Sequence, residues 1–132
     1  DKVELRDPDE DGDLDVFVTH EAQGAQKWYG DHFGAAAGKR LTFETATLPG
    51  TEIALGKADA ALVPTKGRSV DHIGFEVKSI DAFVAKLQAA GIKTDAAIRN
   101  STNASGLRIV FITDPWGTEI ELTEGLVTTP RN

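Results

Sequence analysis

The sequence contains no cysteine and no hydrophobic run long enough to cross a bilayer. The absence of cysteine excludes disulfides and thiol catalysis, but it does not name a compartment. A membrane-spanning helix needs about 20 consecutive apolar residues, so a membrane span is excluded and we expect a soluble protein. Because the chain begins at Asp1 rather than at Met, we expect an upstream segment to have been removed, which leaves both a cytoplasmic location and export open.

Basic residues are outnumbered, with 14 Lys and Arg against 21 Asp and Glu. No cluster of them resembles the basic patch that a phosphate backbone requires, so we expect no nucleic-acid partner. The formal net charge of −7 is uneven, because the first fifteen residues hold eight acidic and two basic side chains, a net of −6, which leaves −1 for the rest. The body of the protein is therefore nearly neutral.

Residues 1–13 form an acidic N-terminal arm. From Asp7 to Leu14, carboxylates at alternate positions precede a glycine and an apolar residue, which is how an EF-hand-like calcium loop begins. The position that should carry the bidentate carboxylate is Val18, so we favour a solvated arm. A calcium-dependent interaction module stays open as a third hypothesis, and it predicts that calcium raises the thermal stability.

The 132 residues, 40% hydrophobic and 27% charged, fit one globular domain or two small modules that share a core. Apolar periodicity and end signals predict helices at residues 21–33 and 79–90. Alternating patterns predict strands at residues 14–19, 41–48, 51–56, 70–77, 95–100, 107–113 and 117–124. Residues 35–39 are predicted as a small-residue connection. A type I turn is predicted at Asp114 to Gly117, between the last two strands.

The sequence also repeats internally. Gly50 to Leu55 and Gly117 to Leu122 agree at five of six positions, and the helix ends at Gly34 and Gly91 correspond. The same register puts Asp15 opposite His72. Each half is then a strand, a helix and two or three further strands, and pairing the halves buries their apolar faces. Since the first half is about ten residues shorter between helix and hairpin, we expect its second strand to be stunted.

Polar side chains share one face of the first and last strands of the second half. Because successive side chains alternate, His72 and Glu76 point to one face of the first strand. Glu119 and Glu121 point away from the apolar residues of the last strand. If the apolar faces pack on the helix, His72 and Glu121 meet over a cavity on the opposite face.

Two motifs in the second half carry a family resemblance. Asp71-His72-Ile73-Gly74-Phe75 and Thr113-Asp114-Pro115-Trp116-Gly117, the latter followed by Glu119-Ile120-Glu121-Leu122, resemble the second module of the vicinal oxygen chelate superfamily. That superfamily includes glyoxalase I, extradiol dioxygenases and bleomycin resistance proteins. The resemblance implies an α+β fold of paired βαβββ modules, which form a cupped, mixed but mostly antiparallel sheet around a small-molecule cavity, with helices on the outer face.

The resemblance covers residues 14–126 as one glyoxalase-like domain. Module one spans residues 14–58, a linker spans 59–69, module two spans 70–126, and 127–132 are a tail. In the superfamily the paired modules come from one chain or are exchanged between two, so a homodimer stays open.

The resemblance also implies a metal site. Members that bind metal take ligands from the first and last strands of both modules, which correspond here to Asp15, His72 and Glu121. Ala54 replaces the fourth ligand, and a shift of the first strand would offer His20 in place of Asp15. One histidine and two carboxylates suit Mn, Fe or Mg, whereas Zn is less favoured without a second nitrogen.

Two functions follow from these residues. The first is a metal-dependent lyase, isomerase or dioxygenase that chelates two neighbouring substrate oxygens, with Glu76 or Glu119 as a general base or else as a solvated rim residue. The alternative is a metal-free protein of the bleomycin resistance type that binds a drug or an aromatic ligand. Ala54 favours this alternative, and Trp28, Tyr29 and Trp116 would supply stacking surface.

Overall fold

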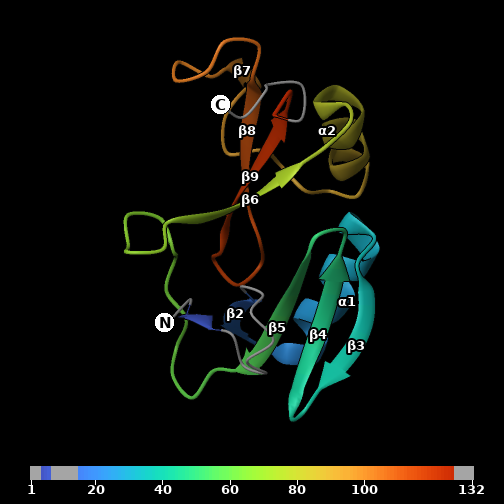
Figure 1. Cartoon of the computed structure of the whole chain (residues 1–132), viewed down its shortest axis with the longest axis vertical. Helices are drawn as coiled ribbons and strands as arrows, with labels where there is room; N and C mark the ends of the chain where they lie inside the picture. The colour runs from blue at the N-terminus through green and yellow to red at the C-terminus, as the bar shows by residue number, and fades with distance from the viewer. Residues whose placement is uncertain (1–3, 7–14, 127–132) are drawn as a thin grey trace. The chain divides into compact units, whose positions relative to one another are not determined.

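The computed structural model describes residues 4–6 and 15–126, with side chains described from residue 21 onward. The fold is α+β, as expected, and it divides into two compact units, Asp1–Val63 and Pro64–Asn132. Each unit has one helix and one mixed sheet (Figure 1). Neither of the described helices is long and apolar enough to span a bilayer.

The first unit has a five-stranded sheet of order β1-β2-β5-β4-β3. Strands β2 and β5 are parallel, and the other neighbours are antiparallel. Its elements are β1 (Glu4–Arg6), β2 (Asp15–His20), α1 (Ala22–Phe33), β3 (Ala36–Arg40), β4 (Phe43–Leu48) and β5 (Thr51–Lys57).

The second unit has a four-stranded sheet of order β6-β9-β8-β7, which is the order β2-β5-β4-β3 repeated. Strands β6 and β9 are parallel, as β2 and β5 are. The elements are β6 (His72–Glu76), α2 (Ile80–Ala89), β7 (Arg99–Asn100), β8 (Arg108–Thr113) and β9 (Glu119–Glu124). The internal duplication read from the sequence is confirmed.

Strand pairing gives the register that the repeat predicted. Val16 pairs with Ile53, and Ile73 pairs with Ile120. Because Ile53 and Ile120 are equivalent positions of the repeat, Val16 corresponds to Ile73. Asp15, one residue earlier, therefore occupies the backbone position that His72 occupies in the second unit.

Each helix covers one face of its own sheet. Helix α1 packs on β4 and β5, and α2 packs on β8 and β9. The buried apolar side chains are Ala25, Tyr29, Ala46, Ile53, Ala54 and Leu55 in the first unit and Ile80, Val84, Leu87, Ile109, Val110, Ile112, Ile120 and Leu122 in the second. Because Ile53, Leu55, Ile120 and Leu122 face the helices, alternation places the residues between them on the opposite faces, Ala54 in β5 and Glu119 and Glu121 in β9.

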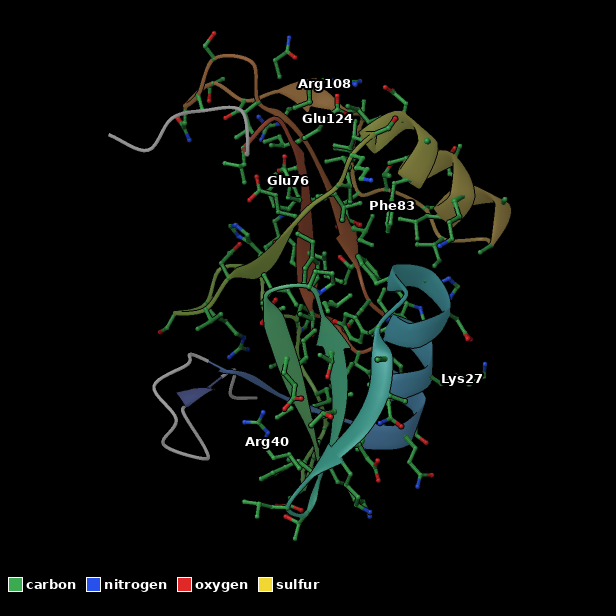
Figure 2. The ribbon with its side chains drawn as sticks, turned by 45° about the vertical axis from the view of Figure 1, so that its right-hand side comes forward. Lys27, Arg40, Glu76, Phe83, Arg108 and Glu124 are labelled. Carbon is green, nitrogen blue, oxygen red and sulfur yellow. The ribbon has the colours of Figure 1, made fainter. Side chains whose placement is uncertain are left out.

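The start of α2 is held by side-chain contacts. The Ser79 hydroxyl caps the helix by accepting a hydrogen bond from the Ala82 N–H (3.3 Å). Glu124 accepts a hydrogen bond from the Ile80 N–H (2.7 Å), and Arg108 forms two hydrogen bonds with Asp81 at 2.7 and 3.0 Å. Figure 2 shows Arg108 and Glu124 beside this end of the helix. These contacts join α2 to the ends of β8 and β9.

The expected second strands are corrected. Ala36–Arg40, predicted as a connection and as a stunted strand, forms the five-residue β3, whereas β7 has only two residues. Strand β3 lacks β-branched residues. The Gln26 side chain on α1, however, donates hydrogen bonds to the carbonyl oxygens of Gly38 in β3 and Thr45 in β4, and it thereby supports the pairing of these strands. Tertiary contacts therefore override a weak local preference for strand.

Part of the acidic arm is also a strand. Glu4–Arg6 forms β1, which pairs with β2 in antiparallel orientation. The calcium-loop candidate at residues 7–13 and the tail at 127–132 lie outside the described residues.

Candidate functional site

The structure brings His72 and Glu121 together on the polar face of the second sheet, which we define by His72, Gly74, Glu76, Glu119, Glu121 and Thr123. The Nε2 atom of His72 lies 3.0 Å from Oε2 of Glu121. Strand pairing sets His72 beside Glu119 and Gly74 beside Glu121, so the imidazole reaches Glu121 diagonally, across a position without a side chain. Both side chains are partly exposed, at 37% and 20%. The pair is therefore open to solvent and to a ligand.

An aromatic ring borders the pair. Phe111 on β8 is the strand partner of Glu121, and its ring lies edge-on to the His72 imidazole, with centroids 5.4 Å apart. It is neither fully buried nor fully exposed. Small-molecule sites combine an apolar surface with a few convergent polar groups, and these three residues provide both.

The other nitrogen of His72 contacts Asp71, a residue that the sequence argument did not select. His72 Nδ1 lies 2.9 Å from Asp71 Oδ1, and the backbone N–H of Gly67 donates a hydrogen bond to Asp71 Oδ2. The hydrogen bond from Gly67, followed by the one from His72, lowers the pKa of Asp71 below its ordinary value. Asp71 is therefore an ionised acceptor at neutral pH.

Glu119 lies on the same face but forms an ion pair with Lys66. Its carboxylate, 4% exposed, is 3.0 Å from Nζ of Lys66, and the hydrogen bond to Glu119 raises the pKa of Lys66. The Glu119 N–H donates to the Thr65 hydroxyl (2.9 Å), which donates in turn to the Asp71 carbonyl oxygen (2.6 Å). Thr65 and Lys66, placed in the linker by the sequence, thus bond to Glu119 in β9, and Thr65 also bonds to Asp71, the residue before β6.

Glu76 lies at the other end of β6, about 13 Å along the strand from His72 at the usual rise per residue. Its carboxylate accepts hydrogen bonds from the Thr123 hydroxyl (2.6 Å) and from the backbone N–H groups of Gly125 (2.8 Å) and Leu126 (3.0 Å). Figure 2 shows Glu76 on this part of the second unit. The structure therefore does not bring Glu76 to the His72–Glu121 pair.

The first unit offers different groups at the equivalent positions. The counterpart of Glu121 is Ala54, which is 3% exposed. The counterpart of Glu119 is Glu52, whose Oε1 lies 2.9 Å from Arg40 Nε and whose Oε2 accepts a hydrogen bond from the Thr47 hydroxyl at 3.1 Å. Figure 2 shows Arg40 on this unit. Asp15 and His20 are located by their backbone only, at the first and last residues of β2.

The aromatic residues named as stacking surface differ in exposure. Tyr29 is completely buried in the first unit, so it offers no surface to a ligand. Trp28 is partly exposed and lies edge-on to His32, with centroids 5.3 Å apart. Trp116 lies in the β8–β9 turn, where its backbone N–H donates a hydrogen bond to Asp114 Oδ1 (3.0 Å).

A complete metal site is not formed by the described side chains alone. Among residues 21–126, no three His, Cys, Asp or Glu side chains are grouped so that they could hold a metal ion. The second unit supplies one nitrogen and one carboxylate, which is half of a four-ligand site.

Comparisons with known structures agree with this fold. FosX, a fosfomycin resistance protein from Listeria monocytogenes, superposes with a TM-score of 0.70 at 17% identity, over 89% of this chain and 95% of that chain. A glyoxalase family protein from Enterococcus faecalis gives 0.67 at 20% identity, over 82% and 92% of the two chains. Lactoylglutathione lyase from Agrobacterium tumefaciens gives 0.61 at 20% identity, over 86% and 92%. At these identities the likeness establishes the fold alone.

Sequence comparison identifies the family. No curated protein sequence matches the chain significantly. The sequence profile of the glyoxalase family, however, matches residues 15–122, which span most of both units and include His72 and Glu121. The chain therefore belongs to the Glyoxalase/Bleomycin resistance protein/Dioxygenase superfamily.

Proposed function

We propose that this protein binds a small molecule through a divalent metal ion, with His72 and Glu121 as the ligands from the second unit. The observation that carries the proposal is the convergence of His72 Nε2 and Glu121 Oε2 to 3.0 Å on a solvent-accessible face. An imidazole nitrogen and a carboxylate oxygen are donors that Mn, Fe, Mg and Zn accept.

The 3.0 Å between the two atoms is the length of a direct hydrogen bond or ion pair. It is also compatible with a shared ion, because two ligands that bind one ion at about 2.1 Å and at a right angle to each other lie about 3.0 Å apart. Metal-bound histidines almost always give their second nitrogen to a carboxylate or carbonyl, and Asp71 occupies that place. Both features support a metal ligand role for His72.

Asp15 is our candidate for a third protein ligand. Its support is the register, because Asp15 occupies in β2 the position of His72 in β6, whereas His20 lies five residues further along. Ala54 has no lone pair to give, so the ion would keep positions for substrate oxygens. The test is the metal affinity of Asp15→Asn beside His20→Gln, and the proposal predicts a loss in the first variant only.

In this proposal the metal ion would polarise the substrate and a side chain of the protein would transfer the proton. A divalent ion would supply Lewis acidity to two neighbouring oxygens of a substrate, as a lyase, isomerase or dioxygenase requires. We assign proton transfer to Glu119, because it lies on the polar face as the strand partner of His72 and its paired cation, Lys66, is 72% exposed. Glu76 is assigned to anchoring the end of β9, since its carboxylate already accepts three hydrogen bonds.

The proposal is tested by metal-dependent stability. A ligand that binds only the folded state at 100 times its dissociation constant adds about 2.7 kcal/mol to the free energy of unfolding. We expect Mn²⁺ to raise the thermal midpoint of the wild type, and His72→Gln and Glu121→Gln to remove the rise. Glu76→Gln is the matched control and should keep it. A wild type that is indifferent to Mn²⁺, Fe²⁺, Mg²⁺ and Zn²⁺ would overturn the proposal.

A metal-free binding protein is the second candidate, and Ala54 is the observation that favours it. In this case His72, Glu121 and Phe111 would contact an organic ligand directly. Binding of an aromatic drug that persists in excess chelator would support this candidate, whereas binding abolished by chelator would support the first.

A homodimer is a further proposal, because modules in this superfamily are paired within one chain or between two. Sedimentation equilibrium across a range of protein concentrations tests it. A single species with the mass of one chain, 14.1 kDa, would contradict it.

A further inference from the structure

Gly74 contributes no side chain to the polar face, although neither its backbone nor its surroundings require a glycine. Unlike Gly67 and Gly117, it does not adopt a positive φ. A Cβ atom at this position would lie 3.9 Å from the Glu121 carbonyl oxygen, an ordinary van der Waals contact. Glycine inside a strand weakens the strand, and it often marks a place where a ligand approaches the backbone closely.

The first unit has a large residue at the equivalent position. Phe17 pairs with Ala54 between β2 and β5, as Gly74 pairs with Glu121 between β6 and β9. The larger residue of the pair is therefore on the first strand in one unit and on the last strand in the other. Because the two units share one topology, the fold itself does not explain a glycine at position 74.

The neighbours of Gly74 on β6 leave the space above it open. His72 and Glu76 lie two residues to either side on the same face, and both side chains reach toward β9. His72 Nε2 lies 3.0 Å from Glu121 Oε2, and the Glu76 carboxylate accepts a hydrogen bond from the Thr123 hydroxyl at 2.6 Å. Gly74 itself is exposed. About 13 Å of strand separates His72 from Glu76, which is room for one aromatic ring.

We propose that Gly74 is the specificity-determining residue of this site: its bare backbone admits the flat aromatic body of a small ligand whose oxygen atoms reach the His72–Glu121 pair. The inference rests on the proposed function for the metal that those oxygens would chelate. The selection of the ligand's body, however, can be measured with or without a metal.

The surroundings favour a flat and partly apolar body. A residue with only hydrogen on its Cα lets a ring come into van der Waals contact with the peptide groups of the strand. Phe111 lies in the same row across the sheet as Gly74 and Glu121, and its ring contacts the His72 imidazole edge-on. Backbone and rings therefore offer contact surface, while the imidazole and the carboxylate offer polar groups.

The test compares two hydroxamates by calorimetry, with and without Mn²⁺. Benzohydroxamate and acetohydroxamate carry the same pair of neighbouring oxygens, and they differ in the aromatic ring. We expect the wild type to prefer benzohydroxamate by about tenfold, as contact with one face of a ring provides. Gly74→Val should lose this preference. Ala37→Val, which enlarges an exposed residue of β3, is the matched control and should keep it.

Urea unfolding of each variant shows whether the change is local. Valine favours strands, so Gly74→Val should be at least as stable as the wild type. Gly74→Ala fills less of the space and should show an intermediate preference, which keeps the test decisive if Gly74→Val fails to fold.

A wild type that binds neither probe or both probes equally, or a folded Gly74→Val that keeps the wild-type preference, would overturn the inference. The Mn²⁺ titrations separate this outcome from the proposed function. If the wild type binds no Mn²⁺, the metal proposal fails, and the preference measured without Mn²⁺ decides the role of Gly74. If Mn²⁺ strengthens the binding of both probes while Gly74→Val keeps the preference, the metal proposal stands and the role of Gly74 fails.

Discussion

Nζ of Lys66 lies 3.0 Å from Oε1 of Glu119 and joins residues 53 positions apart in the chain. The ammonium-bearing side chain is 72% exposed, whereas the Glu119 side chain is 4% exposed. Carboxylates are almost never buried without a partner, so the exposed lysine compensates the buried charge. The pair also closes the loop 64–71 over the start of β9, beside the site.

Replacing Lys66 with Met is predicted to lower the stability of the protein at neutral pH, because Glu119 is left buried without its cation. Since the pKa of Lys66 is raised above its ordinary value of 10.5, the stability from this pair is fully present below that value and is lost as the pH rises through the raised pKa. Urea unfolding at pH 7 and near pH 11.5 should therefore show a difference between the proteins that shrinks at high pH.

Lys27→Met is the matched control for this substitution. Lys27 also pairs with a carboxylate, Asp31 at 2.6 Å, but both side chains are largely exposed. Exposed pairs contribute little, so its loss should have a smaller effect. Equal effects of the two substitutions would contradict the compensating role of Lys66.

Leu41→Asn is predicted to stabilise the first unit by about 1 kcal/mol. Leu41 has φ = 52° in the β3–β4 turn and is 76% exposed, so the residue carries left-handed strain without burying its side chain. Asparagine tolerates this conformation better than leucine. Chemical denaturation of both proteins measures the change, and a loss of stability in Leu41→Asn would contradict the prediction.

Glu76→Gln is predicted to lower stability, whereas Glu119→Gln is predicted to lower activity. The first should lower the free energy of unfolding by about 1 to 2 kcal/mol, because charged hydrogen bonds to Thr123, Gly125 and Leu126 are weakened, and should leave Mn²⁺ binding unchanged. The second should abolish any proton-transfer activity. Measuring substrate turnover and urea unfolding for both variants separates the two effects. A Glu76→Gln variant that loses turnover but keeps native stability would show that the anchoring role had been wrongly assigned to Glu76.

The duplicated fold could be predicted because the repeated residues are those that determine turns, helix ends and strand register. Gly50 and Gly117 both adopt positive φ before the last strand of a unit, and Gly34 and Gly91 do so after the helices. The isoleucines at positions 53 and 120 then fixed the register of β5 and β9. Strand β3 was missed because its alanines, glycine and basic residues have no alternation to detect, and its pairing depends on α1 and β4.

Strand alternation predicts which side chains of the site share a sheet face, but not which of them make contact. Alternation put His72 and Glu121 on one face, and the structure brings them to 3.0 Å. It put Glu76 on the same face, but the hydrogen bonds that hold Glu76 come from a turn 49 positions away. Asp71 was missed because a residue before a strand has no assigned face. The adjacent Asp-His pair was the available signal, and the Gly67 N–H that orients it depends on a loop conformation that the sequence did not specify.

The central claim, that His72 and Glu121 hold one divalent ion, is tested most directly by counting bound metal. Wild type, His72→Ala and Glu121→Gln are purified without chelator, loaded with Mn²⁺, and analysed for metal per chain after desalting. The account predicts about one ion per wild-type chain and a clear loss in both variants. A wild type as empty as His72→Ala, or variants as fully loaded as the wild type, would contradict it.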